Sequence, residues 1–384
     1  MKILLGYSHY VYPIDIAAWV EAWLTRLRSQ GIQVQAFPLT LNPPGPRLRW
    51  RELEARWRRG DKELLKMYEI LARRLEAFDV FINWNGINLH PEFVRQLPIF
   101  TVYGCFDDPE SSQDLSLPVA WAYDLCMVGN IAELEAYRSW GVKEVHHWPL
   151  GFRFDDYDPS LTKEKILNGN RDIDIAMLCE RTYPMRRERL DQLAAAFPQG
   201  AYYGMGWPRG FLPEKERMPL LQRSKIGVNI HNSTGPVNSR TYVLPANGVM
   251  QICDNKSHLA PLFELNKEVV GFENISEAIE LCRYYLDHDH ERRQIAVAGW
   301  ERAVREYNEI ASFKIMLGHV DALNSSTSKA KHDIVISLHM RHQQTRLFRV
   351  FHSLIHPLKS ACRRLKSRIW LKLSGLFRLF CRAS

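Results

Sequence analysis

The sequence predicts an α/β protein made of two successive domains, each with a parallel β-sheet covered by helices. Short apolar runs typical of buried strands alternate with amphipathic stretches of helical spacing. This alternation stops near residue 150 and starts again at Ile173, and 384 residues are too many for one ordinary core. We therefore expect two Rossmann-like domains, residues 1–150 and 151–323, then a polar linker (324–333) and a tail (334–384).

In the first domain, a short apolar run at residues 3–5 predicts a buried strand that ends at Gly6. A helix is predicted to begin after Asp15 and to end at Gly31, because apolar residues recur there at helical spacing: Ile16, Val20, Trp23, Leu24 and Leu27. Alternating apolar residues at 32–36 indicate the next strand. Strand, helix and strand in this order predict a parallel pair with a right-handed crossover.

A second helix follows the proline-rich loop 42–46, and it carries Leu64, Met67, Leu71, Leu75 and Phe78 on one face. Further strands are predicted at 80–82 and 99–102. The segment 146–159 contains two prolines and suits a connection between domains. The second domain then has predicted strands at 175–179, near Tyr202, and at 226–230, 249–253 and 269–272. Its predicted helices lie at 190–197, before Gly248, and from Glu277 and Glu291.

The net charge of +8 is concentrated in the tail. Residues 334–384 hold eleven Lys and Arg and no Asp or Glu, which leaves about −3 for residues 1–333. The body therefore gives no reason to expect a nucleic-acid partner. Seven cysteines without a C-x-x-C pair argue for reduced thiols and against a zinc cluster or a disulfide framework. No secretory or membrane-spanning run is found, so we expect a cytoplasmic protein.

The tail has the pattern of an amphipathic helix that lies on a membrane. Its apolar residues recur at helical spacing on both sides of Pro357, and Trp370, Phe377 and Phe380 are possible anchors among basic residues. Docking on an anionic membrane at the cytoplasmic face is the favoured interpretation. An RNA-binding arm and a helix that packs on the protein are the alternatives.

Ligands of an open parallel sheet bind beyond the carboxyl ends of its strands, where helix N-termini point N–H groups outward. Candidate donor-site residues therefore follow the predicted strands of the second domain: Glu180, Arg181, Gly204, Gly206, Trp207, His231, Asn238, Arg240, Thr241, Tyr242 and Asp254. Arg181 and Arg240, the latter with the N–H groups of its helix start, suit a diphosphate. Gly204 and Gly206 allow close backbone approach, and Trp207 suits stacking on a base; solvated arginines and a plain turn are the alternatives.

In the first domain, Asp107 and Asp108 follow a strand and are candidates for a catalytic base or for binding sugar hydroxyls; an ordinary Asp-Pro turn is the alternative. Two acidic motifs resemble metal sites. Asp172 and Asp174 lie at the start of a strand, the wrong end for a ligand, and the 287–290 cluster is explained by helix capping. We expect no metal site and no cofactor.

In combination and in this order, nine segments over residues 1–315 resemble the CgeB-like (spore-maturation-type) family of group 1 glycosyltransferases. They are FDDPESS (106–112), YDLCMVGNIAELEAYRSWGV (123–142), HWPLGF (147–152), DIAMLCERTYPMRRERL (174–190), YYGMGW (202–207), KIGVNIH (225–231), NSRTYVLPANG (238–248), LAPLFELNKEVVGF (259–272) and RYYLDHDHERRQIAVAG (283–299).

The resemblance implies a GT-B fold, in which two Rossmann-like domains face a central cleft. It also implies a nucleotide-sugar donor bound mainly by the second domain, an acceptor held by the first, and no obligatory metal. One position departs from the family, which usually has a donor-binding Glu where this sequence has Val243. The predicted function is transfer of a hexosyl or related sugar to a glycan or lipid-linked acceptor in polysaccharide biosynthesis. A catalytically inactive sugar-binding or scaffold protein and a nucleotide-sugar epimerase are the alternatives.

Overall fold

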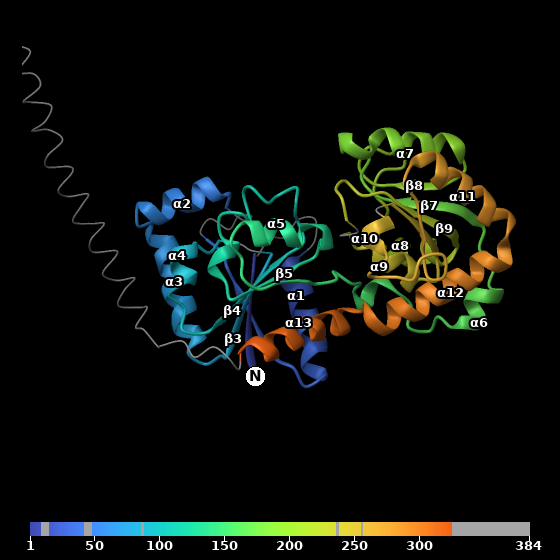
Figure 1. The fold of residues 1–384 in the computed structure, drawn as a ribbon. Helices are drawn as coiled ribbons and strands as arrows, with labels where there is room; N and C mark the ends of the chain where they lie inside the picture. The colour runs from blue at the N-terminus through green and yellow to red at the C-terminus, as the bar shows by residue number, and fades with distance from the viewer. Residues whose placement is uncertain (9–14, 42–47, 86–87, 236–237, 255, 325–384) are drawn as a thin grey trace, which may run out of the picture.

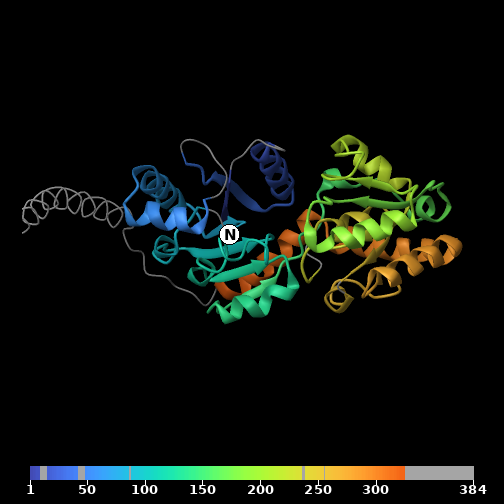
Figure 2. The ribbon, with the colours of Figure 1, turned by 90° about the horizontal axis from the view of Figure 1, so that it is seen from above.

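The computed structural model describes residues 1–8, 15–41, 48–85, 88–235, 238–254 and 256–324. Within them the chain forms two α/β domains that lie side by side (Figure 1 and Figure 2). The predicted tail and all of the predicted linker except Asn324 fall outside the described residues, as does the proline-rich loop.

Six parallel strands form the first sheet, in the order β2-β1-β3-β4-β5-β6. The strands are β1 (Lys2–Tyr7), β2 (Gln33–Pro38), β3 (Val80–Trp84), β4 (Phe100–Cys105), β5 (Leu125–Val128) and β6 (Val145–His147). The helices of this half are α1 (Ile16–Ser29), α2 (Trp50–Arg58), α3 (Lys62–Leu75), α4 (Pro91–Val94) and α5 (Leu134–Ser139), with short 3-10 turns at Ala120–Ala122 and Ile131–Glu133. The predicted parallel pairing of the first two strands is confirmed, with Leu4 opposite Gln35.

Five parallel strands form the second sheet, in the order β11-β10-β9-β7-β8. They are β7 (Ile173–Leu178), β8 (Ala201–Tyr203), β9 (Ser224–Asn229), β10 (Met250–Cys253) and β11 (Val270–Gly271). The helices are α6 (Lys163–Asn168), α7 (Pro184–Ala196), α8 (Glu214–Gln222), α9 (Arg240–Ala246), α10 (Lys256–Leu259), α11 (Ile275–Asp287) and α12 (Asp289–Glu306), and a 3-10 turn spans Phe154–Asp156. Two parallel-sheet domains, as predicted, are the result.

The helix that follows α12, α13 (Glu309–Asn324), runs back beneath the first domain (Figure 1). Its buried residues Phe313, Met316 and Val320 belong to the same apolar cluster as α1. Trp148 donates an indole hydrogen bond to the Ser312 carbonyl at 3.0 Å, and Glu309 forms an ion pair with Arg26 of α1. The sequence-based division placed residues up to 323 in the second domain. A position in the chain does not show which core a helix packs against, so the contact of α13 with the first domain could not be predicted.

Local sequence signals explain the first helix well. The Asp15 carboxylate accepts hydrogen bonds from the backbone N–H groups of Ala17 and Ala18, which caps the helix. The predicted apolar stripe is the buried face of α1. Gly31, just beyond its end, has φ of +80°, a conformation that glycine adopts without steric cost.

Strands β5 and β6 were not predicted. The four residues of β5 are all buried between β4 and β6, so the run has no alternation, and β6 has only three residues. Both are strands because of their neighbours in the sheet rather than because of a sequence period.

The structure also shows the contacts of the two acidic motifs and of the cysteines. Asp172 and Asp174 pair with Arg223 and Lys225 at one end of β7, as their structural interpretation predicted. The capping predicted for the 287–290 cluster is wrong, because the N-cap residue of α12 is His288 and makes no side-chain cap hydrogen bond, and Asp289 pairs instead with Arg292 and Arg293. The five cysteines within the described residues are buried free thiols. Among the helices of the described part of the chain, none has the length and apolar character needed to cross a bilayer.

Candidate functional site: a basic cavity between the domains

A cavity of about 550 Å³ lies between the two domains. The first domain contributes an aromatic wall that includes Trp19, Trp84 and Phe106. The second domain contributes charged residues at the carboxyl ends of its strands, among them Glu180, Arg186 and Arg240. This is the position at which open parallel sheets bind ligands.

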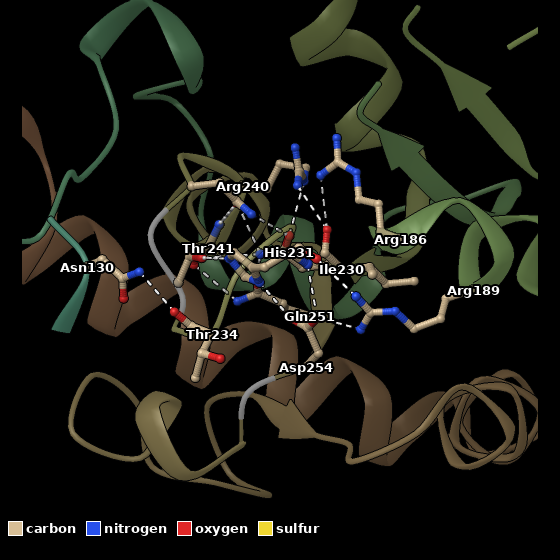
Figure 3. Close-up of polar contacts among 12 residues, drawn as sticks. Asn130, Arg186, Arg189, Ile230, His231, Thr234, Arg240, Thr241, Gln251 and Asp254 are labelled. Carbon is tan, nitrogen blue, oxygen red and sulfur yellow. Dashed lines mark hydrogen bonds and ion pairs between the residues drawn. The ribbon is translucent and has the colours of Figure 1, made fainter. Parts of the chain in front are cut away.

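Two guanidinium groups, those of Arg186 on α7 and Arg240 on α9, converge on one side of this cavity. Both donate hydrogen bonds to the carbonyl of Ile230, at 3.2 Å from Arg186 and 3.4 Å from Arg240 (Figure 3). Arg186 also donates to the Glu180 carbonyl at 2.7 Å and 3.1 Å, and Arg240 to the Leu178 carbonyl at 3.3 Å. Two like charges are therefore held close together.

Neutral acceptors alone hold these two arginines. Arg186 is 5% exposed, yet neither it nor Arg240 takes part in any ion pair among the described residues. Burial, followed by the charge of Arg186 and opposed by Cys179 and Asp254, lowers the pKa of the Arg240 guanidinium. Buried charges in proteins are normally paired. Such a pair of guanidinium groups, one buried and one half-buried, faces the cavity without a carboxylate partner of its own and is therefore suited to an anionic ligand.

Asn229, at the end of β9, fixes the position of Arg240. Its side-chain oxygen accepts hydrogen bonds from Arg240 Nε at 3.1 Å and from Asn238 Nδ2 at 3.0 Å. Its amide nitrogen donates to Thr241 and Gln251 at 3.2 Å and 3.1 Å. This network is buried, so it restricts the rotamer of Arg240 before any ligand binds.

A second buried network lies beneath the first. His231 Nδ1 and Asp254 Oδ1 are 2.6 Å apart, and the other carboxylate oxygen accepts from the His231 backbone N–H at 2.9 Å and from Arg189 at 3.2 Å. His231 Nε2 lies 3.4 Å from the Thr241 hydroxyl (Figure 3). Burial lowers the pKa of His231. Neither His231 nor Asp254 lines the cavity, and their side chains contact Thr241 and Arg189, which do not line it either.

His231, Cys253 and Asp254 are a group of potential metal ligands, with ligand atoms within 4.8 Å of one another. A tetrahedral metal with bonds of about 2.0–2.3 Å separates its ligand atoms by roughly 3.3 Å or more. The His231–Asp254 contact of 2.6 Å is a hydrogen bond and is too short for this arrangement. Burial also raises the pKa of the Cys253 thiol well above its usual value, which disfavours the thiolate that binds metals. This group does not fit a metal in its present geometry.

Arg181 does not lie where the sequence placed it. Its guanidinium pairs with Asp191 of α7 and lies 5.4 Å from the ring of Trp207, and it does not line the cavity. Trp207 is 8% exposed, stacks on Tyr202 at 5.0 Å and donates to the Cys179 carbonyl, so its ring is not open to a nucleobase. Sequence position alone could not tell these contacts from ligand contacts.

The glycines of the same segment have different settings. Gly204 lines the cavity with φ of +131°, and a Cβ there would lie 2.3 Å from the Cys179 carbonyl oxygen. Gly206, with φ of +86°, does not line it. Gly204 therefore allows the chain to pass close to the end of β7.

The start of α9 contributes less than expected to anion binding. The helix has seven residues, and the N–H groups of Thr241, Tyr242 and Val243 already donate to Asn238 or Ser239. Tyr242 is fully buried in the core behind α9, and Thr241 is buried in the Asn229 network. Ser239, the N-cap residue of α9, lines the cavity, but the Arg240 side chain rather than the N–H groups of the helix start is the feature of α9 that suits an anion.

Three carboxylates line the cavity: Asp156, Glu180 and Glu309. Asp156 pairs with Arg153 at 2.9 Å, and Glu309 pairs with Arg26. Glu180, at the end of β7, takes part in no ion pair among the described residues. Val243 also lines the cavity, so an apolar side chain stands where the family resemblance places a carboxylate.

Asp107 and Asp108 lie outside the cavity lining. Asp108 is 1% exposed, its carboxylate accepts a hydrogen bond from Tyr137 at 2.7 Å, and burial raises its pKa. Asp107 accepts from Asn85 at 3.0 Å. In this geometry neither carboxylate lines the cavity, and the catalytic role of this pair stays a prediction.

The domains also touch at one polar point beside the site. Asn130, which follows β5, donates to the carbonyl of Thr234 at 2.9 Å across the two domains (Figure 3). Sequence reasoning did not single out Asn130, Asn229 or Arg186 as site residues. Asparagines at strand ends were the available signal, since β5 and β9 are followed or ended by them.

Residues 181–315 match a family model described as glycosyl transferase-like. This segment begins just after β7, continues through Arg186 and Arg240, and ends in α13. The comparison with curated protein sequences finds no match.

Several solved structures share the arrangement of both domains. HepE of Anabaena, solved in complex with UDP, has a TM-score of 0.57 and 13% identity, over 84% of this chain and 100% of that one. This chain has the GT-B fold. Sucrose-phosphate synthase from Thermosynechococcus elongatus gives 0.56 and 14% identity over 85% of this chain and 100% of its own. A Rickettsia africae glycosyltransferase gives 0.53 and 12% over 85% and 99%. At these identities the likeness concerns the fold.

Proposed function

We propose that this protein is a nucleotide-sugar-dependent glycosyltransferase, and that Arg186 and Arg240 bind the diphosphate of the donor. The observation that carries the proposal is the pair of guanidinium groups that faces the interdomain cavity without a carboxylate partner. The glycosyl transferase-like match over residues 181–315 includes both arginines, and the UDP complex of HepE has the same fold. These three findings support the same kind of ligand.

The chemistry that follows is stabilisation of a leaving group. As the bond between the sugar and the diphosphate breaks, negative charge grows on the phosphate oxygens. Guanidinium groups already in place stabilise this charge without reorganisation during the reaction. Asn229 keeps Arg240 in place for this role, and the unpaired carboxylate of Glu180 is our candidate for binding donor hydroxyl groups.

The acceptor is proposed to be a glycan or a lipid-linked saccharide, reached at the cytoplasmic face of a membrane. The support is the composition of residues 334–384, which carry eleven basic and no acidic residues. The test compares the full chain with a chain that lacks residues 334–384 in co-sedimentation with liposomes of 30% anionic lipid. We expect the full chain alone to sediment, and equal sedimentation of both would reject the membrane proposal.

A non-catalytic sugar-binding protein is the second candidate, because Val243 lines the cavity where the family resemblance places a donor-binding Glu. Such a protein would bind a nucleotide sugar without consuming it. An assay for glycosyl transfer, or for slow hydrolysis of the donor, distinguishes a transferase, which consumes the donor, from such a binding protein, which does not. The epimerase alternative predicts consumption of the donor without any acceptor and with the sugar still attached to the nucleotide.

Thermal denaturation with nucleoside diphosphates tests the proposal. UDP is the first probe, followed by GDP, ADP and CDP, each against its nucleoside as a control without phosphate. A ligand at 100 times its Kd stabilises the folded state by about 2.7 kcal/mol, which raises the melting temperature by a few degrees. If no diphosphate raises the melting temperature of the full chain, the transferase proposal fails.

A further inference from the structure

The part of the cavity lining that comes from the first domain contains a cluster of three tryptophans, which we call the tryptophan wall: Trp19, Trp23 and Trp84. The ring centroids of Trp19 and Trp84 are 4.9 Å apart with an interplanar angle of 24°, and those of Trp19 and Trp23 are 5.5 Å apart at 30°. Trp23 and Trp84 are 5.9 Å apart, so the three rings form a triangle rather than a stack. All three line the cavity.

The fold explains why these rings meet. Trp19 and Trp23 lie one helical turn apart on the same face of α1, and Trp84 ends β3. The carboxyl end of β3 is therefore brought next to α1 at the edge of the sheet where ligands bind. Trp23 is 5% exposed and packs against Phe313 of α13, whereas Trp19 and Trp84 keep part of their surface open.

Charged groups line the same cavity as the tryptophan wall. They are Arg153, Asp156 and Glu309, of which the first two pair with each other at 2.9 Å and the third pairs with Arg26. The cavity thus combines broad ring surface with fixed hydrogen-bonding groups. A pyranose ring has the matching structure, because one face presents C–H groups and the rim presents hydroxyls. A long alkyl or isoprenoid chain would cover the ring surface but would make no hydrogen bond to these charged groups.

From this combination we infer that the tryptophan wall binds the sugar ring of a saccharide acceptor, with Trp19 and Trp84 as the stacking surface. The inference rests on the proposed function, which assigns the arginine pair of the second domain to the donor diphosphate. The site lies in the first domain, on residues that no diphosphate contact requires. Binding of saccharide and binding of nucleotide can therefore be lost separately.

Saturation-transfer NMR on the full chain tests the inference, with methyl glycosides of glucose, galactose, mannose and N-acetylglucosamine as probes. Spectra are recorded with and without UDP, and farnesyl phosphate is the probe for an isoprenoid occupant. The variants are Trp19→Ala, Trp84→Ala and the ring-retaining Trp84→Tyr. The matched control is Trp121→Ala, since Trp121 is 40% exposed and does not line the cavity.

We expect saturation of the ring C–H protons of at least one glycoside, and about tenfold weaker binding in each alanine variant, the usual scale for removal of a buried tryptophan anchor. Trp84→Tyr should retain most of the binding and Trp121→Ala all of it, while UDP raises the melting temperature of every variant as in the wild type. Absence of glycoside binding, binding unchanged by the alanine variants, or saturation of farnesyl phosphate alone would overturn the inference. Loss of the UDP effect in the wild type would instead overturn the proposed function.

Discussion

Replacing Arg240 with glutamine separates the binding role of this side chain from its structural role. Arg240 donates to Asn229 at 3.1 Å and to the carbonyls of Leu178 and Ile230 at 3.3 Å and 3.4 Å. The two carbonyl contacts are long, and glutamine keeps two N–H donors. The variant also loses repulsion from Arg186. We therefore expect the free energy of unfolding without ligand to change by less than about 1 kcal/mol.

The effect on nucleotide binding should be larger. A hydrogen bond to a charged group contributes about 1.5–3 kcal/mol, and each 1.4 kcal/mol changes Kd about tenfold. Arg240→Gln should therefore weaken UDP binding about ten- to a hundredfold, and Arg186→Gln should do the same. Because both guanidinium groups contact one carbonyl, the double variant should deviate from the sum of the single effects.

Isothermal titration calorimetry with UDP gives these affinities, and urea denaturation gives the stabilities. Arg187→Gln is the matched control, since Arg187 follows Arg186 on α7 but is exposed and does not line the cavity. Unchanged UDP affinity in both Arg186→Gln and Arg240→Gln would refute the assignment of the diphosphate to this pair. So would an equal loss in Arg187→Gln.

Three further predictions concern stability. Gly204→Ala should lower the free energy of unfolding by about 3 kcal/mol, because φ is +131° and the new Cβ lies 2.3 Å from a carbonyl oxygen. Gly210→Ala is the control and should lower it by about 1 kcal/mol, because φ is +63° and nothing lies near the new Cβ. Urea denaturation measures both values, and equal losses would contradict this reasoning. Burial lowers the pKa of His147 from 6.5 to about 4, so its neutral form stabilises the folded state above pH 6.5 and this contribution falls between pH 6.5 and about 4. Chemical denaturation should therefore show that the free energy of unfolding of His147→Asn falls by up to about 3 kcal/mol less than that of the wild type as the pH is lowered through this window. Parallel profiles of stability against pH would exclude this contribution of His147. Glu309→Ala breaks the partly buried pair with Arg26 and should lower the free energy of unfolding by about 2 kcal/mol in thermal denaturation. Glu306→Ala removes more exposed pairs and should lower it by less than about 1 kcal/mol. The reverse order would contradict the role of α13 in holding the first domain.

The fold followed from local signals wherever elements were long and periodic. The Asp15 cap, the apolar stripe of α1 and the apolar run of β7 each determine their element without help from distant residues. The short strands β5 and β6 and the return of α13 to the first domain depend on contacts far apart in the chain, such as that between Trp148 and Ser312. Such contacts leave no periodic signal.

The candidate site was predictable as a region but not residue by residue. The strand-end rule singled out Glu180, Gly204 and Arg240, and all three line the cavity. It could not distinguish Arg240, which faces the cavity, from Arg181, which pairs with Asp191. That difference depends on one carboxylate on α7, and the tryptophan wall depends on two elements separated by sixty residues of sequence.

A crystal structure of the full chain with UDP would test the central claim most directly. We predict that the diphosphate lies in the interdomain cavity, with phosphate oxygens within about 3 Å of the guanidinium nitrogens of both Arg186 and Arg240. A nucleotide bound elsewhere, or bound in this cavity without contact to either arginine, would contradict the claim.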